Sequence, residues 1–226
     1  KGNKTMKKTI EIEKTETTFF IPAKYYQAVS QSASKDETRY YLKGVFMHNA
    51  DTGFYMVATN GHTLLQADLP KAAFIGDKVT CNHSGNEGAI LVMDTMEKAF
   101  KAKTAGDLWI YGDTATGIAQ FVSMSQGETT LERVGVTEFT IIDGSFPDYR
   151  RVVPTNFETN SKGQPFKKHD FSFDPAYITM VAKAAAFLSV NKSPAMSFTL
   201  AGAGDAAKVN FREVPQMFGV LVPCCM

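Results

Sequence analysis

The sequence predicts an α+β fold in which antiparallel sheets carry helices on one face. The prediction depends on two observations. A strand, a helix and then several strands follow one another three times along the 226 residues. Each helix is short and is followed by three or four strand-like runs separated by turn residues. One helix for several antiparallel strands is typical of sheets that are covered by helices on one side.

The first unit begins with a strand over residues 9–20, where apolar and polar residues alternate loosely. A helix over 22–33 follows, because Pro22 suits a first turn and apolar residues then recur at helical spacing. Asn60-Gly61 predicts a hairpin with a type I′ turn, since both residues tolerate positive φ. The strands expected in this unit are 40–48, 54–59 and 62–69.

The second unit places a helix from Asp94 to about Lys103, with Asp94 as its cap. In the third unit, Asp174-Pro175 opens a helix as N-cap and first-turn residue. Residues 155–168 are polar and are expected to form a loop. The strands expected in these two units are 74–81, 89–92, 108–111, 118–123, 130–139, 169–173, 196–200, 208–211 and 218–222.

Residues 143–154 read Asp-Gly-Ser-Phe-Pro-Asp-Tyr-Arg-Arg-Val-Val-Pro and form the connector between two predicted domains. Pro147 and Pro154 fix their own φ and favour an extended residue before them, so 146–154 is expected to be stiff and extended. The connector separates a two-unit domain, residues 1–145, from a shorter one-unit domain, residues 146–226. An apolar and cationic connector suggests a ligand crevice at the boundary.

Composition is that of an ordinary globular protein, with 44% hydrophobic and 21% charged residues and a net charge of +1. Binding to nucleic acid would therefore depend on a local patch. Three cysteines, Cys81, Cys224 and Cys225, indicate a reducing compartment rather than a disulfide framework. Neither a secretory segment nor a long apolar run is present, so a cytoplasmic protein without a membrane span is expected.

No catalytic signature is found, so the chain is not expected to be an enzyme or to hold a cofactor. Phosphate-binding loops, nucleophile elbows and metalloprotease motifs are absent from the sequence. Cys81-Asn82-His83 has no second ligand pair at zinc spacing, so no metal site is predicted.

Basic residues occur on all three predicted helices. The simpler interpretation is a solvated helix surface. The alternative is that the helices face one way and offer cations to a DNA phosphate backbone. Arg39 and Tyr40 are further candidates, since a tyrosine can stack on a base. The lysines concerned are Lys24, Lys98, Lys101 and Lys183.

Four runs resemble the bacterial sliding clamp family, the β subunit of DNA polymerase III. They are Arg39–Gly44, Val57–Leu64, Asp143–Pro154 and Val220–Pro223. The third run is the most specific of the four. Their order and spacing are similar to those of the family's middle domain leading into its last domain, from about residue 20 onward.

The resemblance implies sheets outside and helices lining a hole, in a ring that encircles duplex DNA and tethers a polymerase. Polymerase and clamp loader would bind by short linear peptides in a crevice. Thr63 stands where the family usually has arginine, so the motif preference is expected to differ. The positions that match the family's crevice are Leu42, Thr59, Gly61, His62, Thr63, Leu64, Pro147, Arg151, Val152, Val220, Val222 and Pro223.

Two alternatives stay open at this point. His62 has a structural interpretation, as a turn histidine, beside its place in the crevice. The chain has no counterpart of the family's first domain, and residues 155–226 hold one unit where two are usual. It is therefore expected to be either a ring-forming clamp, as a dimer or trimer, or a non-ring module that binds the same peptides and competes for clamp partners.

Overall fold

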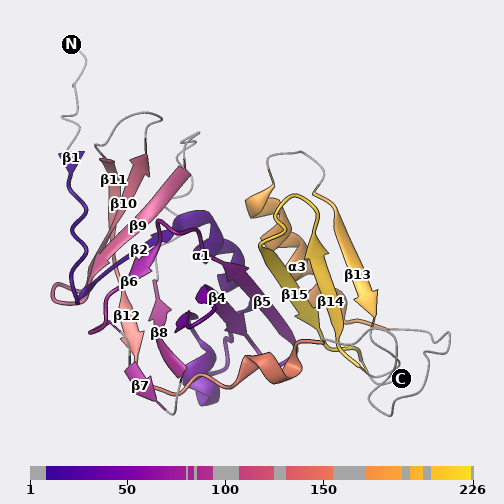
Figure 1. Cartoon of the computed structure of the whole chain (residues 1–226). Coiled ribbons are helices and arrows are strands. Elements are labelled where there is room, and N and C mark those ends of the chain that lie inside the picture. Colours follow the sequence, from indigo (N-terminus) through magenta and orange to yellow (C-terminus); the bar gives the residue numbers. More distant parts are fainter. Residues whose placement is uncertain are drawn as a thin grey trace.

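The computed structural model describes residues 9–79, 81–83, 86–93, 107–124, 131–154, 172–189, 194–200 and 205–224. Within these ranges, antiparallel strands form two sheets, with helices packed against them (Figure 1). The first sheet has six strands in the order β1-β11-β10-β9-β2-β6. The bounds are β1 Thr9–Ile10, β2 Thr18–Pro22, β6 Phe74–Ile75, β9 Asp107–Asp113, β10 Ile118–Met124 and β11 Leu131–Glu138.

The second sheet has nine strands, with the path β12-β8-β3-β4-β5-β15-β14-β13 and β7 paired to β8. Strand β15 joins the C-terminal strands to the N-terminal ones by pairing with β5, with Leu221 opposite Thr63 and Met217 opposite Ala67 (Figure 1). The bounds are β3 Val45–Ala50, β4 Gly53–Thr59, β5 Thr63–Asp68, β7 Cys81–His83, β8 Asn86–Val92, β12 Thr140–Ile142, β13 Met196–Leu200, β14 Ala207–Phe211 and β15 Met217–Leu221.

Two α-helices, α1 Ala23–Val29 and α3 Pro175–Leu188, pack against each other. Helix α1 also contacts β9, β4 and β5, so it lies between the two sheets (Figure 1). All residues of α1 except Lys24 are buried. Helix α3 begins as the sequence predicts, because the Asp174 carboxylate accepts a hydrogen bond of 2.7 Å from the Ala176 amide.

Strand alternation divides the side chains of the second sheet between two apolar clusters. Val45 and Met47 of β3 belong to the main core, together with α1 and α3. Phe46, between them, points to the opposite face. There it joins a second cluster, called the outer cluster below. Its buried members are Leu42, Phe46, Val57, Leu64, Ile90, Phe146, Tyr149 and Val220.

The α+β prediction is confirmed by the two antiparallel sheets and the helices packed against them. The predicted helix over 22–33 is α1 followed by a 3₁₀ turn, Ser30–Ser32. The expected helix at 94–103 and loop at 155–168 lie outside the described residues. The domain division at 145/146 stays a prediction, since strands from both sides share one sheet.

Several local predictions are wrong in detail. Residues 76–79 are not strand, so the expected strand over 74–81 is reduced to β6, and residues 172 and 173 of the strand expected over 169–173 are not strand either. Residues 11–17 are not strand, so the expected strand over 9–20 is reduced to β1 and β2. The expected strand over 40–48 begins as a 3₁₀ segment, Glu37–Leu42, because the Asp36 carboxylate accepts from the Thr38 amide at 2.9 Å and starts a turn. The connector is not extended throughout, since Tyr149–Val152 forms a 3₁₀ turn.

Candidate functional site

A pocket of about 170 Å³ lies at the junction of β5, β15 and the connector. It combines strand residues from both ends of the chain with the 3₁₀ turn of the connector. Its lining residues are Leu42, Thr59, Gly61, His62, Thr63, Leu64, Pro147, Asp148, Tyr149, Val152, Val220 and Val222. We call this pocket the crevice.

The structure brings together all the predicted crevice residues except Arg151 and Pro223, which do not line it. Arg151 is instead 83% exposed at its side chain, and its Nε lies 2.9 Å from Oδ2 of Asp148. Asp148 and Tyr149 line the crevice but were missed. The spacing between Tyr149 and Val152 could have predicted that both residues line the crevice, because residues three apart lie on the same side of a 3₁₀ turn. The extended connector expected from the sequence would place them on opposite sides.

The floor of the crevice follows from strand alternation. Leu64 of β5 and Val220 of β15 are directly opposite each other, and both point to the outer face of the sheet. Their neighbours in sequence, Leu65 and Leu221, point to the main core. A shift of one residue in the β5–β15 register would turn the side chains that form the floor to the other face of the sheet. The β5–β15 pairing therefore determines which side chains form the floor.

The β4–β5 turn forms one rim, and its geometry differs from the predicted one. The Asn60 amide donates to the Thr63 carbonyl at 3.3 Å, so Gly61 and His62 stand at the tip. Gly61 has φ +92°, which glycine adopts readily. Asn60 acts through its side chain, whose Oδ1 accepts from the His62 and Thr63 amides at 2.9 and 2.8 Å. The hairpin is therefore present, with its tip moved by one residue.

His62 makes a structural hydrogen bond in the turn and also lines the crevice, so both interpretations of this residue stay compatible with its position. Its carbonyl accepts a hydrogen bond of 3.0 Å from the Val222 amide, which ties the turn to the chain after β15. Its exposed ring stacks on Tyr177 of α3, with centroids 5.1 Å apart and planes at 10°. The ring therefore borders the crevice and also links the β4–β5 turn to the last helix.

Thr63 is turned away from solvent. Its hydroxyl lies 3.0 Å from Oγ of Ser32, and the residue is buried. The position where the family usually has arginine is therefore occupied by a small side chain that bonds inward. The rim of the crevice therefore has one positive charge fewer than it would have with an arginine at position 63.

The connector is held against the sheet by aromatic side chains. Phe146 stacks on Phe46, with centroids 4.8 Å apart and planes at 9°. Tyr149 Oη lies 3.0 Å from Nδ1 of His48, and Nη2 of Arg150 lies 3.1 Å from Nε2 of the same ring. Burial lowers the pKa of His48 and the Arg150 guanidinium lowers it further, while the Asp148 carboxylate acts in the opposite direction. Burial raises the pKa of Tyr149 to about 12.

The candidate DNA-contacting residues lie on separate elements. Lys24 and Lys183 are exposed on α1 and α3. Arg39 lies in the 3₁₀ segment before β3, where its Nη1 donates to the Asn60 carbonyl at 3.3 Å. Tyr40 is also exposed and packs edge-on against Tyr41. Lys98 and Lys101 lie outside the described residues.

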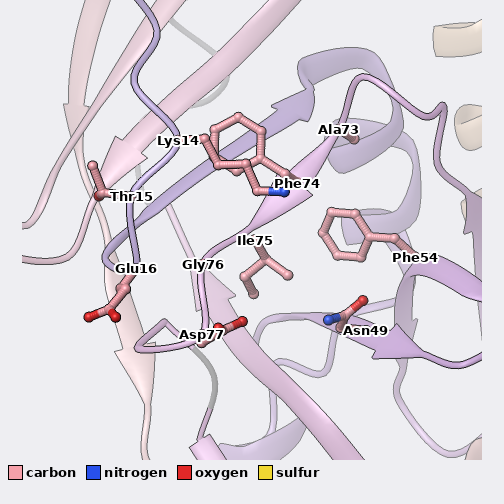
Figure 2. A pocket seen from close by; sticks show the side chains of 10 residues that line it. All are labelled: Lys14, Thr15, Glu16, Asn49, Phe54, Ala73, Phe74, Ile75, Gly76 and Asp77. Atoms are coloured by element: carbon pink, nitrogen blue, oxygen red, sulfur yellow. The ribbon is translucent and has the colours of Figure 1, made fainter.

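A larger cavity, of about 510 Å³, lies between the segment before β2, the β3–β4 turn and β6 (Figure 2). Its charged groups have partners close by, since Lys78 Nζ lies 2.6 Å from Glu16 and Lys14 Nζ lies 5.5 Å from the Phe74 ring centroid. Its lining mixes charged side chains, Lys14, Glu16 and Asp77, with apolar ones, Phe54, Phe74 and Ile75. The crevice, with its apolar floor and polar rim, is therefore the better candidate for a ligand site.

The described residues show neither a metal site nor a membrane helix. No group of three or more His, Cys, Asp or Glu side chains gathers there in a way that could hold a metal ion. Among the same residues, no helix has the length and apolarity needed to cross a membrane.

Comparison with solved structures defines the class of protein to which this architecture belongs. A DnaN sliding clamp, DNA polymerase III subunit beta, from Bartonella birtlesii, in a structure bound to griselimycin, aligns with a TM-score of 0.61 at 20% identity. The alignment covers 99% of this chain and 70% of that one. The β sliding clamp of C. crescentus aligns with a TM-score of 0.55 at 17% identity, over 96% of this chain and 69% of that one. The fold is that of the DNA sliding clamps.

Sequence comparison names the relatives. The chain is 29% identical to the beta sliding clamp of Rickettsia bellii over 137 residues, which is 59% of this chain and 32% of the relative. It is 31% identical to that of Caulobacter vibrioides over 127 residues, 54% of this chain and 29% of the relative. No family model matches the chain. The chain is thus similar in sequence to bacterial beta sliding clamps, and the similarity spans about a third of the length of these proteins.

Proposed function

We propose that the chain is a clamp-like processivity factor, which tethers a DNA polymerase to duplex DNA through a short linear peptide bound in the crevice. The crevice itself carries the proposal. It places an apolar floor, formed by Leu64 and Val220, between a turn that bears His62 and a connector wall that bears Tyr149. Such a groove suits an extended peptide with glutamine and leucine side chains.

The proposal includes double-stranded DNA, a polymerase and a clamp loader as partners, and it involves no catalytic step. The structure of the C. crescentus clamp that was compared above is described with PEG at a proposed beta-motif tethering region. This supports the idea that a protein of this fold accommodates an extended chain. The DNA-facing surface would include Lys24 and Lys183, which are exposed on the two packed helices.

The peptide-binding part is tested by titrating a fluorescent peptide, rich in Gln and Leu, with the full chain. Val152 lines the crevice and is 54% exposed, so Val152→Glu places a charge in the apolar groove without disturbing a core. Val136 is 56% exposed on β11 and does not line the crevice, so Val136→Glu is the matched control. We expect Val152→Glu to weaken binding at least tenfold and the control to bind as the wild type does. Equal affinities for all three proteins would exclude the crevice.

The tethering part is tested by retention on circular and linear plasmid in the presence of clamp loader. A closed ring stays on circular DNA and slides off linear DNA. Light scattering gives the oligomeric state in the same buffer. Retention that is equally poor on both forms of DNA would reject the tethering role.

A second function is favoured by the small cationic surface of α1, which offers only Lys24 to solvent. It is a non-ring module that binds the same peptides and competes for clamp partners. This function is selected if the chain is monomeric, binds peptide and is not retained on circular DNA.

A further inference from the structure

Three side chains form a hydrogen-bonded chain behind the crevice wall, in which His48 and Tyr149 are buried and Arg150 is exposed. His48, on the outer face of β3, is only 2% exposed. Both of its ring nitrogens face the connector, with Nδ1 3.0 Å from Tyr149 Oη and Nε2 3.1 Å from Arg150 Nη2. We call His48, Tyr149 and Arg150 the wall latch, because their hydrogen bonds join β3 to the connector. Pro147, Asp148 and Tyr149 of the connector line the crevice and form its wall.

Arg150 determines which nitrogen of His48 carries the proton. A guanidinium group can only donate hydrogen bonds, so Nε2 must accept through its lone pair. In a neutral imidazole the proton is then on Nδ1, and Nδ1–H donates to Tyr149 Oη. A doubly protonated ring has no lone pair for Arg150 and would place an N–H against an N–H. The wall latch therefore requires neutral His48.

The groups around His48 favour the neutral form. Burial and Arg150 both lower its pKa, and Asp148, which acts in the opposite direction, is exposed and paired with Arg151. Among the side chains that the structure describes, the other titratable groups near the ring are Tyr149 and Tyr55, with ring centroids 5.8 and 6.2 Å from that of His48. Since the pKa of Tyr149 is raised to about 12, its hydroxyl stays neutral in any buffer used below.

The wall latch acts on the crevice through one short turn. Tyr149 and Arg150 begin the 3₁₀ turn that ends at Val152, a residue of the crevice lining. On the other side, Phe146 is stacked on Phe46, a contact that uses neither hydrogen-bonding atom of His48, although the Phe46 ring also stacks on the His48 ring at 5.3 Å. Loss of the latch would therefore free the turn at 149–152 while Phe146 stays anchored.

We infer that His48 is a positioning residue, which holds the Pro147–Val152 wall of the crevice in its binding geometry and releases it when it takes up a proton. This inference rests on the proposed peptide binding. It makes the affinity of the crevice for a linear peptide decrease as the pH falls from neutral to mildly acidic. His48 does not line the crevice, so it acts through Tyr149 and Arg150.

Two variants separate titration from packing. His48→Gln places an amide oxygen where Nε2 stands, so it can still accept from Arg150 and does not titrate. His48→Phe keeps a ring of similar size and removes both hydrogen-bonding atoms. Peptide affinity is measured for the wild type and both variants between pH 7.5 and about 5, the range in which histidine changes charge. Thermal unfolding at pH 7.5 verifies that each variant is folded.

We expect the wild type to lose affinity about three- to tenfold on acidification, the factor expected for one hydrogen bond of ordinary net strength. The two proteins differ only at position 48, so the difference between their pH profiles isolates His48. His48→Gln is expected to lack the His48 component of the decrease, and His48→Phe to bind weakly at every pH. Identical profiles for the wild type and His48→Gln would overturn the inference.

A readout without peptide separates this inference from the proposed function. The ¹H–¹³C methyl signals of Val152 and the ring signals of His48 are followed by NMR over the same pH range. The Val152 methyl shifts are expected to change at the pH at which His48 titrates, and to stay constant in His48→Gln. A wild type that binds no peptide at pH 7.5 but shows this coupled change contradicts peptide binding only. If the Val152 methyl shifts do not change when His48 is protonated, the inference is contradicted, whether or not peptide binds.

Discussion

Replacing Phe146 by alanine is expected to remove the main apolar anchor of the connector. Phe146 is 4% exposed and stacks on Phe46 at 4.8 Å. Burying a Phe side chain is worth about 1.5–3 kcal/mol, and an aromatic pair adds about 0.5–1.5 kcal/mol. Because connector, sheet and cavity relax only in part, the free energy of unfolding should fall by about 3–5 kcal/mol.

The assay is urea unfolding followed by far-UV circular dichroism, with Phe146→Leu as the control. Leucine retains most of the apolar volume and loses the ring stack, so it should cost below about 1.5 kcal/mol. With a slope of about 2 kcal/mol/M, the alanine variant should unfold at a urea concentration about 1.5–2.5 M lower than the wild type. A loss below about 1 kcal/mol for Phe146→Ala would refute the view that this residue anchors the wall.

Three further predictions follow from the same contacts. Tyr149→Phe leaves the Nδ1–H of His48 buried without an acceptor and should lower the free energy of unfolding by about 1–3 kcal/mol in urea titration; an unchanged midpoint would contradict the assigned bond. Asp174→Ala removes the cap of α3 and should cost about 1 kcal/mol, with Asp174→Asn close to the wild type. The lowered pKa of His48 means that the unfolded chain takes up the proton first as the pH falls. The contribution of His48 to the free energy of unfolding is therefore complete above about pH 6.5 and is lost as the pH falls toward the folded-state pKa. His48→Gln should reduce this pH dependence in unfolding curves measured at several pH values.

The sequence was most informative where local chemistry determines local structure. The α3 start depends on Asp174 and Pro175 alone, and neighbours in sequence determine it. The crevice residues were found through the family resemblance, which already contains the tertiary arrangement. Nothing in the local sequence places Leu64 opposite Val220, because that pairing is long-range.

The connector shows why the rest could not be predicted. Two prolines favour extended backbone locally, but tertiary contacts decide the conformation of the residues between them. Tyr149 and Arg150 reach His48 only because the chain turns at 149–152. The sequence does not show that one buried and one part-buried hydrogen bond to His48 outweigh the local preference for extended backbone. The same turn placed Tyr149 in the crevice lining and Arg151 outside it.

The pairing of β5 with β15 has a consequence for biosynthesis. Thr63 and Leu221 are opposite each other in the sheet, so the floor of the crevice joins segments made at very different times during translation. Contacts of such large sequence separation form late, after loop closure has reduced the entropy of the chain. A nascent chain that ends before β15 has the β4–β5 hairpin but lacks the opposing half of the floor. If the crevice binds a peptide as proposed, the complete apolar floor is available only after β15 has been synthesised and has paired with β5.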